Sequence, residues 1–152
     1  RAAGVQMHHV KPHGALYNMA AKDEKLARAI VEGICEVDDR LTLLALSGSE
    51  MLLAAEKAGL RAASEVFADR GYQADGTLVP RSKPGAMITD ETQAIERVVR
   101  MVTEGVVTAV DGTDVPLCAD SICVHDDGDK ALLFVQKIRA ALEAKGVALK
   151  AL

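Results

Sequence analysis

A short apolar run, LTLLAL at residues 41–46, limits what this chain can fold into. A strand that is apolar along its whole length has to be covered on both faces, as the strands of parallel sheets are. The stretch before it, residues 22–37, carries one apolar stripe at helical spacing, formed by Leu26, Ile30, Ile34 and Val37. Together these patterns indicate a helix followed by a buried parallel strand.

The same alternation of strand and helix patterns continues along the chain. Strands are predicted at 5–10, 41–46, 62–67, 106–110 and 121–124, with a candidate final strand at 147–152. Helices are predicted at 22–37 and from Ser47 or Ser49 to Gly59, where the helix ends. A third helix is predicted through Ile95, Val98, Val99 and Val102. A fourth is predicted at 129–144, with Phe134, Ile138, Ala141 and Leu142 facing inward. This order indicates an α/β protein built from βα units. The length of 152 residues favours a single domain, residues 1–152.

Composition argues against several kinds of partner. A net charge of −4 disfavours nucleic acid, which usually binds to a basic face. No apolar run is long enough to span a membrane, so no membrane association is expected. Three cysteines without a CxxC pair indicate a reducing compartment, and we expect the cytoplasm. Two of them, Cys118 and Cys123, are interpreted as small buried apolar residues.

Known cofactor motifs are not found in the sequence. There is no HExxH, no Walker A loop and no GxGxxG. His8 and His9 alternate along a predicted strand, so their rings point to opposite faces and cannot share one ion. No metal-ligating residue is predicted.

Polar side chains follow several of the predicted strands, at the point where each strand ends. They are Lys11, His13 and Asn18 after the first strand, Ser47, Ser49 and Glu50 after the second, Glu65, Asp69, Arg70, Asp75 and Arg81 on and after the third, and His125, Asp126 and Asp127 after the strand at 121–124. In a parallel βα array the loops after the strands emerge on one side. These groups are therefore expected to converge on one edge.

Each of these residues also has a purely structural interpretation. Lys11 and His13 fit an exposed loop equally well. Asp69-Arg70 fits a local ion pair, which contributes little to stability. The aspartates of HDD, at 125–127, fit an N-terminal helix cap, and Asp75-Gly76 fits a turn.

Three stretches together resemble a known family. They are VKPHGALYN at 10–18, EVFADRGYQADGTLVPRSKPGAMI at 65–88 and SICVHDD at 121–127. In this order they resemble the LamB/YcsF family, the A subunits of bacterial ATP-dependent 5-oxoprolinases, formerly called lactam utilisation proteins. The resemblance extends over essentially the whole chain.

The resemblance implies an irregular seven-stranded (β/α) barrel similar to polysaccharide deacetylases, of which this chain holds the later part. The family's first strand and its segment rich in histidine and glycine are not in this sequence. A half barrel leaves exposed strand edges, so the missing part is expected from another segment, a partner copy or sequence beyond these residues. A second departure is Asp126, which stands where the family usually has glycine.

The resemblance also implies a reaction, in which 5-oxo-L-proline, ATP and water give L-glutamate, ADP and phosphate. ATP with Mg²⁺ is the expected cofactor, the B and C subunits are the expected partners, and a homo-oligomer is a further option. On chemical grounds we expect His13, Glu65, Asp69 and His125 to be catalytic, and Lys11, Asn18, Arg70 and Arg81 to bind substrate or phosphate. The alternatives are a metal-dependent hydrolase of the deacetylase type and a non-catalytic subunit that binds substrate or acts as a scaffold.

Overall fold

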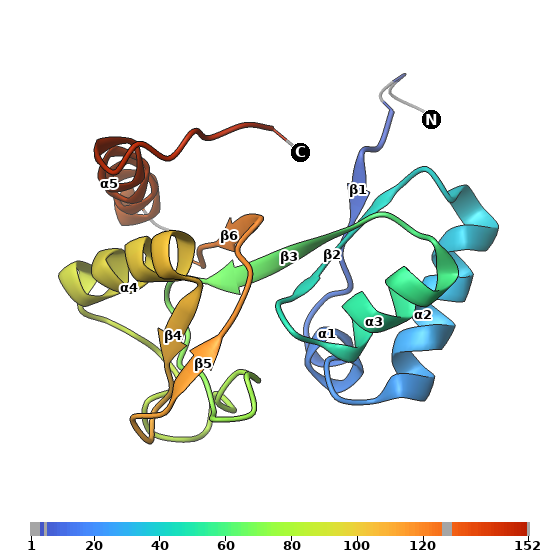
Figure 1. Ribbon diagram of the computed structural model, residues 1–152, viewed down its shortest axis with the longest axis horizontal. Coiled ribbons are helices and arrows are strands. Elements are labelled where there is room, and N and C mark those ends of the chain that lie inside the picture. The colour runs from blue at the N-terminus through green and yellow to red at the C-terminus, as the bar shows by residue number, and fades with distance from the viewer. Residues whose placement is uncertain (1–3, 5, 126–128, 152) are drawn as a thin grey trace. The chain divides into compact units, whose positions relative to one another are not determined.

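The computed structural model describes residues 4, 6–125 and 129–151, and it has an α/β fold (Figure 1). Its strands are β1 (His9–Val10), β2 (Thr42–Leu46), β3 (Ala62–Phe67), β4 (Val106–Thr108), β5 (Asp114–Pro116) and β6 (Ser121–Cys123). Its helices are α1 (Ala15–Ala20), α2 (Glu24–Asp38), α3 (Glu50–Ala58), α4 (Glu91–Glu104) and α5 (Asp129–Ala144). In the part of the chain that the structure describes, no helix is both long and apolar enough to cross a membrane.

Four strands are hydrogen-bonded in the order β1-β2-β3-β6, and β4 and β5 form a separate two-stranded sheet. The pairs β1/β2 and β3/β6 are parallel, as the βα pattern predicts. The chain divides into two compact units, with the boundary inside β3 between Ser64 and Glu65. Whether these units form one domain stays a prediction, and each is described here by itself.

In the first unit, α2 packs against α3. The side chain of Asp23 caps α2 by accepting a hydrogen bond from the backbone N–H of Leu26, at 3.0 Å. The residues of α2 that are fully buried are Ala27 and Val31, one position away from the predicted stripe. Val37, predicted to face inward, is 77% exposed. The prediction at Val37 is therefore wrong, because the buried face of α2 runs through Ala27 and Val31 instead.

Two boundaries near the start of the chain differ from the prediction. Among the described residues β1 is only His9–Val10, and Val5 lies outside them. A short helix, α1, begins directly after Gly14, whose φ of 61° needs glycine. This short helix follows the loop that starts after β1, while the long helix predicted at 22–37 is confirmed as α2.

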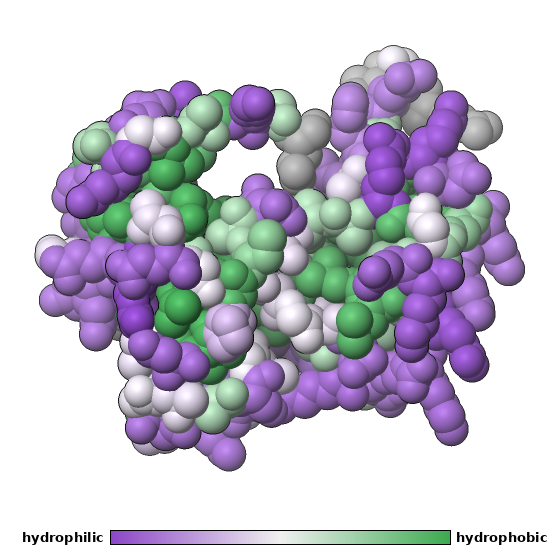
Figure 2. Space-filling model, viewed as in Figure 1, coloured by the Kyte–Doolittle hydropathy of each residue, from purple (hydrophilic) through white to green (hydrophobic). Residues whose placement is uncertain are grey.

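The second unit is built around an apolar cluster that joins α4 and α5 to the end of β3. Its buried members are Ala68, Val98, Ile138 and Leu142, with Ile95, Val99, Val102, Ile122, Val124, Phe134 and Val147 packed against them. The inward positions predicted for α4 are therefore confirmed, as are Phe134, Ile138 and Leu142 of α5, whereas Ala141 is only half-buried and is not part of the cluster. Other apolar side chains of α5 face solvent: Leu132, Leu133 and Val135 are 66%, 51% and 45% exposed. Figure 2 shows hydrophobic surface in the region that α4 and α5 occupy.

One strand prediction in the second unit is confirmed over a shorter span, and another is wrong. The predicted strand 106–110 is β4, which ends at Thr108 and pairs antiparallel with β5 around the turn at Asp111-Gly112. It is thus not part of a βα unit, because a two-stranded ribbon returns directly on itself. Within the described residues 147–151 no strand forms, and Val147 packs on the apolar cluster instead of extending a sheet.

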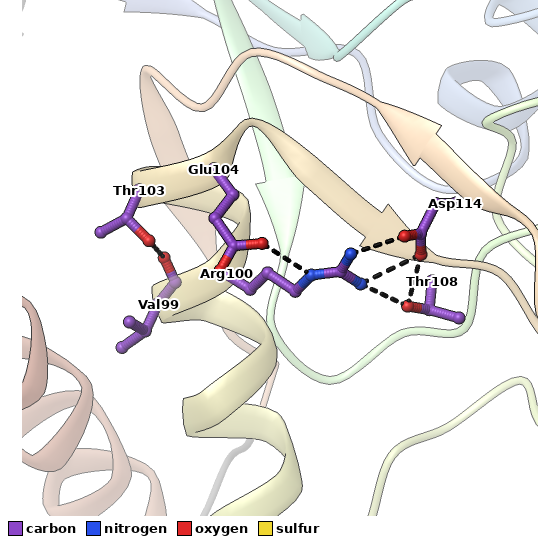
Figure 3. A network of polar contacts seen from close by, with 6 residues as sticks. All are labelled: Val99, Arg100, Thr103, Glu104, Thr108 and Asp114. Carbon is purple, nitrogen blue, oxygen red and sulfur yellow. Dashed lines mark hydrogen bonds and ion pairs between the residues drawn. The ribbon is translucent and has the colours of Figure 1, made fainter.

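A polar network fastens α4 to this ribbon (Figure 3). The Arg100 guanidinium donates to both carboxylate oxygens of Asp114, at 3.0 and 2.6 Å, and to Glu104 Oε2 at 3.0 Å. The hydrogen bonds from Arg100 and Thr108 hold the pKa of Asp114 down to about 2. The planar, two-point contact orients the ribbon on the helix.

The loop after β3 is closed by an unusually tight approach of two backbone segments. A Cβ placed on Gly71 would lie 2.0 Å from the carbonyl oxygen of Gly85, so only glycine fits at position 71. At Gly33, in the exposed middle of α2, an added Cβ meets no described atom within 4 Å.

We expect Gly71→Ala to lower the free energy of unfolding by about 1–3 kcal/mol, because the backbone around Gly85 has to move. Gly33→Ala is the matched control, and it should raise the free energy of unfolding by about 0.5–1 kcal/mol through better helix propensity. Urea unfolding followed by circular dichroism measures both. Equal stability of Gly71→Ala and the unchanged protein would contradict the tight packing of this loop.

Candidate active site

Several ionisable groups of the second unit lie on one face of the β3–β6 pair. The register places Glu65 beside Ser121 and Phe67 beside Cys123. Because paired residues on neighbouring strands point to the same side and alternate residues share a face, this face also receives the side chains two positions further on, Asp69 and His125. The opposite face carries Ala68, Ile122 and Val124, which pack into the apolar cluster with α4 and α5. The helices therefore cover one face and the ionisable groups occupy the other.

Asp69 and His125 meet just beyond the carboxyl ends of these two strands. Nδ1 of His125 lies 3.3 Å from both carboxylate oxygens of Asp69. The Asp69 side chain is 8% exposed and the His125 side chain 40% exposed. An ionised carboxylate can only accept a hydrogen bond, so an ionised Asp69 selects the neutral tautomer of His125 that has its hydrogen on Nδ1 and leaves Nε2 as an acceptor. The pair therefore presents a basic nitrogen whose ring is oriented by a buried carboxylate.

Two aromatic residues hold the histidine ring in place. The ring of His125 stacks on Phe67, with centroids 5.5 Å apart and planes 12° apart. The hydroxyl oxygen of Tyr72 accepts the backbone N–H of Phe67 at 2.9 Å. Burial raises the pKa of Tyr72 far above its usual value, so its hydroxyl stays protonated. The ring is thus fixed at its edge by Asp69 and at its face by Phe67.

Arg70 supports the site by bonding to the backbone of the loop at 68–90. It is 4% exposed, and its Nε and Nη2 donate to the carbonyl oxygens of Ala86 (3.1 Å) and Val79 (2.7 Å). Burial lowers the pKa of Arg70, the charge of Arg81 lowers it further, and Asp69 opposes both. These contacts tie the start of the loop at 68–90 to its end and place a buried positive charge near the Asp69 carboxylate.

The remaining predicted residues of the second unit have different surroundings. Glu65 is buried on β3, at 3% exposure, and Arg81 is exposed in the loop at 68–90. The Asp75 carboxylate accepts the backbone N–H of Thr77 at 2.9 Å, so the predicted turn at Asp75-Gly76 is confirmed. Asp126 and Asp127 lie outside the described residues.

The residues predicted after β1 and β2 belong to the first unit. Lys11 Nζ lies 5.4 Å from the centre of the Tyr17 ring, His13 is exposed, and Asn18 Nδ2 donates to the carbonyl oxygen of Gly14 at 3.1 Å. After β2, Ser49 is the N-cap residue of α3, one of the two positions predicted, but its hydroxyl makes no capping bond to the described helix. That these residues converge with Asp69 and His125 stays a prediction.

Sequence reasoning did not assign Phe67, Tyr72 or Cys123 to this site. The sequence indicates a buried Cys123, yet this residue is partly exposed, and its Sγ lies 3.8 Å from Nε2 of His125. The spacing of two residues along one strand, which puts both side chains on the same face, could have indicated this. In the part of the chain that the structure describes, no three His, Cys, Asp or Glu side chains are grouped so as to hold a metal ion.

The fold and site define an α/β protein with an aspartate–histidine pair at the ends of adjacent parallel strands. The chain belongs to the LamB/YcsF family, whose family model matches residues 1–152. It is 61% identical, over 97% of its length, to a protein of Clostridium beijerinckii that is named as the A subunit of 5-oxoprolinase. It is 52% identical, over its full length, to the protein of that name from Bacillus subtilis.

A solved structure agrees with this assignment. The crystal structure of a lactam utilization protein from Thermus thermophilus superposes with a TM-score of 0.86 at 44% identity, over 99% of this chain. The chain spans only part of these proteins, namely 58% of the Clostridium protein, 59% of the Bacillus protein and 60% of the Thermus chain. The family and the parallel α/β fold are therefore established for these residues.

We expect Arg70→Lys to lower the free energy of unfolding by about 1–3 kcal/mol, because an ammonium group cannot reach both buried carbonyls and one of them loses its partner. Arg139→Lys is the matched control, since Arg139 is exposed and pairs with Glu143 in the next helical turn. Its substitution should change stability negligibly. Urea unfolding of both variants tests this, and equal effects at the two positions would remove Arg70 from the structural support of the site.

Proposed function

We propose that this chain forms part of the A subunit of a 5-oxoprolinase that hydrolyses 5-oxo-L-proline to L-glutamate at the expense of ATP. The observation that carries the proposal is the high identity, over nearly the whole chain, to proteins named as that subunit. The word subunit in those names implies further subunits, and we propose that they are the B and C subunits.

The proposal includes the finer architecture of the fold. In an irregular seven-stranded (β/α) barrel similar to polysaccharide deacetylases, helices lie outside and the inner face carries the chemistry. The β3–β6 pair fits this arrangement, since α4 and α5 pack on one face while Glu65, Asp69 and His125 lie on the other. The strands that complete the barrel would come from the part of the protein beyond these residues.

Ring opening is difficult because 5-oxoproline is an unstrained amide. When bound, ATP supplies a phosphoryl group that can convert the lactam oxygen into a good leaving group. We propose that Lys11 and Arg81 bind its phosphates or the substrate carboxylate, with Asn18 donating a hydrogen bond. Arg70 contributes positive charge through space, since its described hydrogen bonds are given to backbone carbonyls.

The proton transfers are assigned to the histidines. Nε2 of His125 takes a proton from the water that attacks the ring carbon, and it returns a proton to the ring nitrogen as the carbon–nitrogen bond breaks. A second water would then release phosphate from the acyl phosphate that remains, giving the glutamate side-chain carboxylate. Asp69 stabilises the imidazolium that forms and keeps its orientation. His13 is proposed as a second acid or base, and Glu65 as a carboxylate that orients the water or Mg²⁺.

The test is glutamate release from 5-oxoproline by a full-length protein that contains this sequence, with and without ATP and with and without the B and C subunits. We expect release only when ATP and both partners are present, and His13→Ala should reduce it sharply without unfolding the protein. Release without ATP would favour the metal-dependent hydrolase instead. A His13 variant that weakens binding but leaves the chemical step unchanged would favour a substrate-binding or scaffold subunit.

Replacing His125 provides a sharper test of the mechanism. We expect His125→Gln to lower kcat by about 10²–10⁴-fold, the usual contribution of a general acid–base group. His8→Gln is the matched control, because His8 is an exposed histidine outside the proposed site, and it should leave kcat unchanged. The pH dependence of kcat/KM should lose one ionisation in the His125 variant alone. A His125 variant with full activity would exclude this residue from proton transfer.

A further inference from the structure

Cys123 completes a linear arrangement of three side chains on the polar face of β3 and β6. Its Sγ lies 3.8 Å from Nε2 of His125, and Nδ1 of the same ring lies 3.3 Å from the Asp69 carboxylate. Both ring nitrogens are thus engaged by residues of this face, one with a thiol and the other with a buried carboxylate. This is the order of nucleophile, base and orienting acid found in cysteine-dependent acyl transfer.

The contacts of Asp69 fix the direction in which a proton can move. Because Nδ1 gives its hydrogen to Asp69, Nε2 has a free lone pair that faces the thiol. Oδ2 of Asp69 is buried and makes no hydrogen bond of its own among the described residues, although it lies 3.3 Å from Nδ1. A buried carboxylate stabilises a positive charge that forms on the ring in contact with it. Transfer of the thiol proton to Nε2 creates that charge.

The surroundings of Cys123 include a buried cation. The thiol lies close enough to the buried Arg70 guanidinium and to Tyr72 for charge on its sulfur to affect the pKa of each. Burial keeps Tyr72 uncharged, so the described groups near the sulfur include His125, the cationic Arg70 and a neutral phenol, with Asp69 behind the histidine. Cys123 is partly exposed and the His125 side chain is 40% exposed, so a small reagent can reach both.

We propose that Cys123, His125 and Asp69 form a nucleophilic thiol site that accepts small electrophilic acyl compounds. The Sγ proton moves to Nε2, a bond forms between Sγ and the acyl carbon, and the leaving group departs with the proton that Nε2 returns. The product is an S-acyl cysteine that water can hydrolyse. This reactivity goes beyond the proposed function, since it needs neither ATP nor a partner subunit.

The chain contains its own controls for a test of this reactivity. Cys118 is exposed, but burial of its sulfur and the nearby Asp120 raise the pKa of its thiol. Cys35, in α2, is a free thiol in the first unit. All three can be followed in one sample by peptide mass spectrometry after timed treatment of the folded protein with iodoacetamide.

At pH 7 an ordinary thiol, with a pKa of about 8.5, is only a few per cent thiolate. We therefore expect Cys123 to react with iodoacetamide at least about tenfold faster than Cys118 and Cys35. In His125→Gln, whose melting temperature serves as the folding control, its rate should fall about tenfold and follow the pH dependence of an ordinary thiol. With p-nitrophenyl acetate, the acetyl group should be found on Cys123 of the unchanged protein.

The result that overturns the proposal is a Cys123 rate no higher than that of Cys118 in the unchanged protein, which requires no variant. A fast Cys123 whose rate does not change in His125→Gln would also overturn it, because the activation would not come from the histidine. Failure of glutamate release from 5-oxoproline has no bearing on this outcome, since alkylation does not depend on that reaction.

Discussion

The parallel pairing of β3 with β6 is the constraint on which the site depends. Its register sets Phe67 beside Cys123, so the residues two positions later, Asp69 and His125, come together without any further adjustment. A shift of one residue would turn the whole polar set toward the helices and expose the apolar set. Packing of α4 and α5 on the other face prevents that shift, because it requires Ala68 and its neighbours to stay buried.

A carboxylate that is buried beside the β3–β6 strand pair needs positive charge close to it. The Asp69 carboxylate lies 3.3 Å from Nδ1 of His125. Burial lowers the pKa of Arg70 and of Arg97, and the negative charge of Asp69 opposes that lowering. Arg97 extends from α4 and donates to the carbonyl oxygens of Ala68 and Arg70, at 3.4 and 3.1 Å. The same arginines thus satisfy loop carbonyls and offset the buried charge, which links the stability of the second unit to the state of its site.

The two chemistries proposed for the polar face share one base. In the proposed oxoprolinase reaction His125 activates water, whereas in the thiol site it activates Cys123. One imidazole can do only one of these at a time, so a group attached to the sulfur would compete with water for Nε2. The reaction of Cys123 with a small acyl compound would therefore block hydrolysis at this face, and the two activities are separable by experiment.

Local patterns in the sequence determined most of the elements. The apolar run at 41–46, the stripes of α4 and α5 and the glycine after α3 predicted a parallel α/β fold, because periodicity and chain-stopping residues act over a few positions. The positions of Asp69 and His125 after predicted strands, together with their chemistry, indicated both residues. Only the tertiary structure decided that these two side chains touch and that Cys123 lies beside them. It also decided that Arg70 donates to backbone carbonyls and that the strand predicted at 106–110 belongs to an antiparallel ribbon. Those outcomes depend on strand register and on contacts between residues far apart in the chain, which no local pattern encodes.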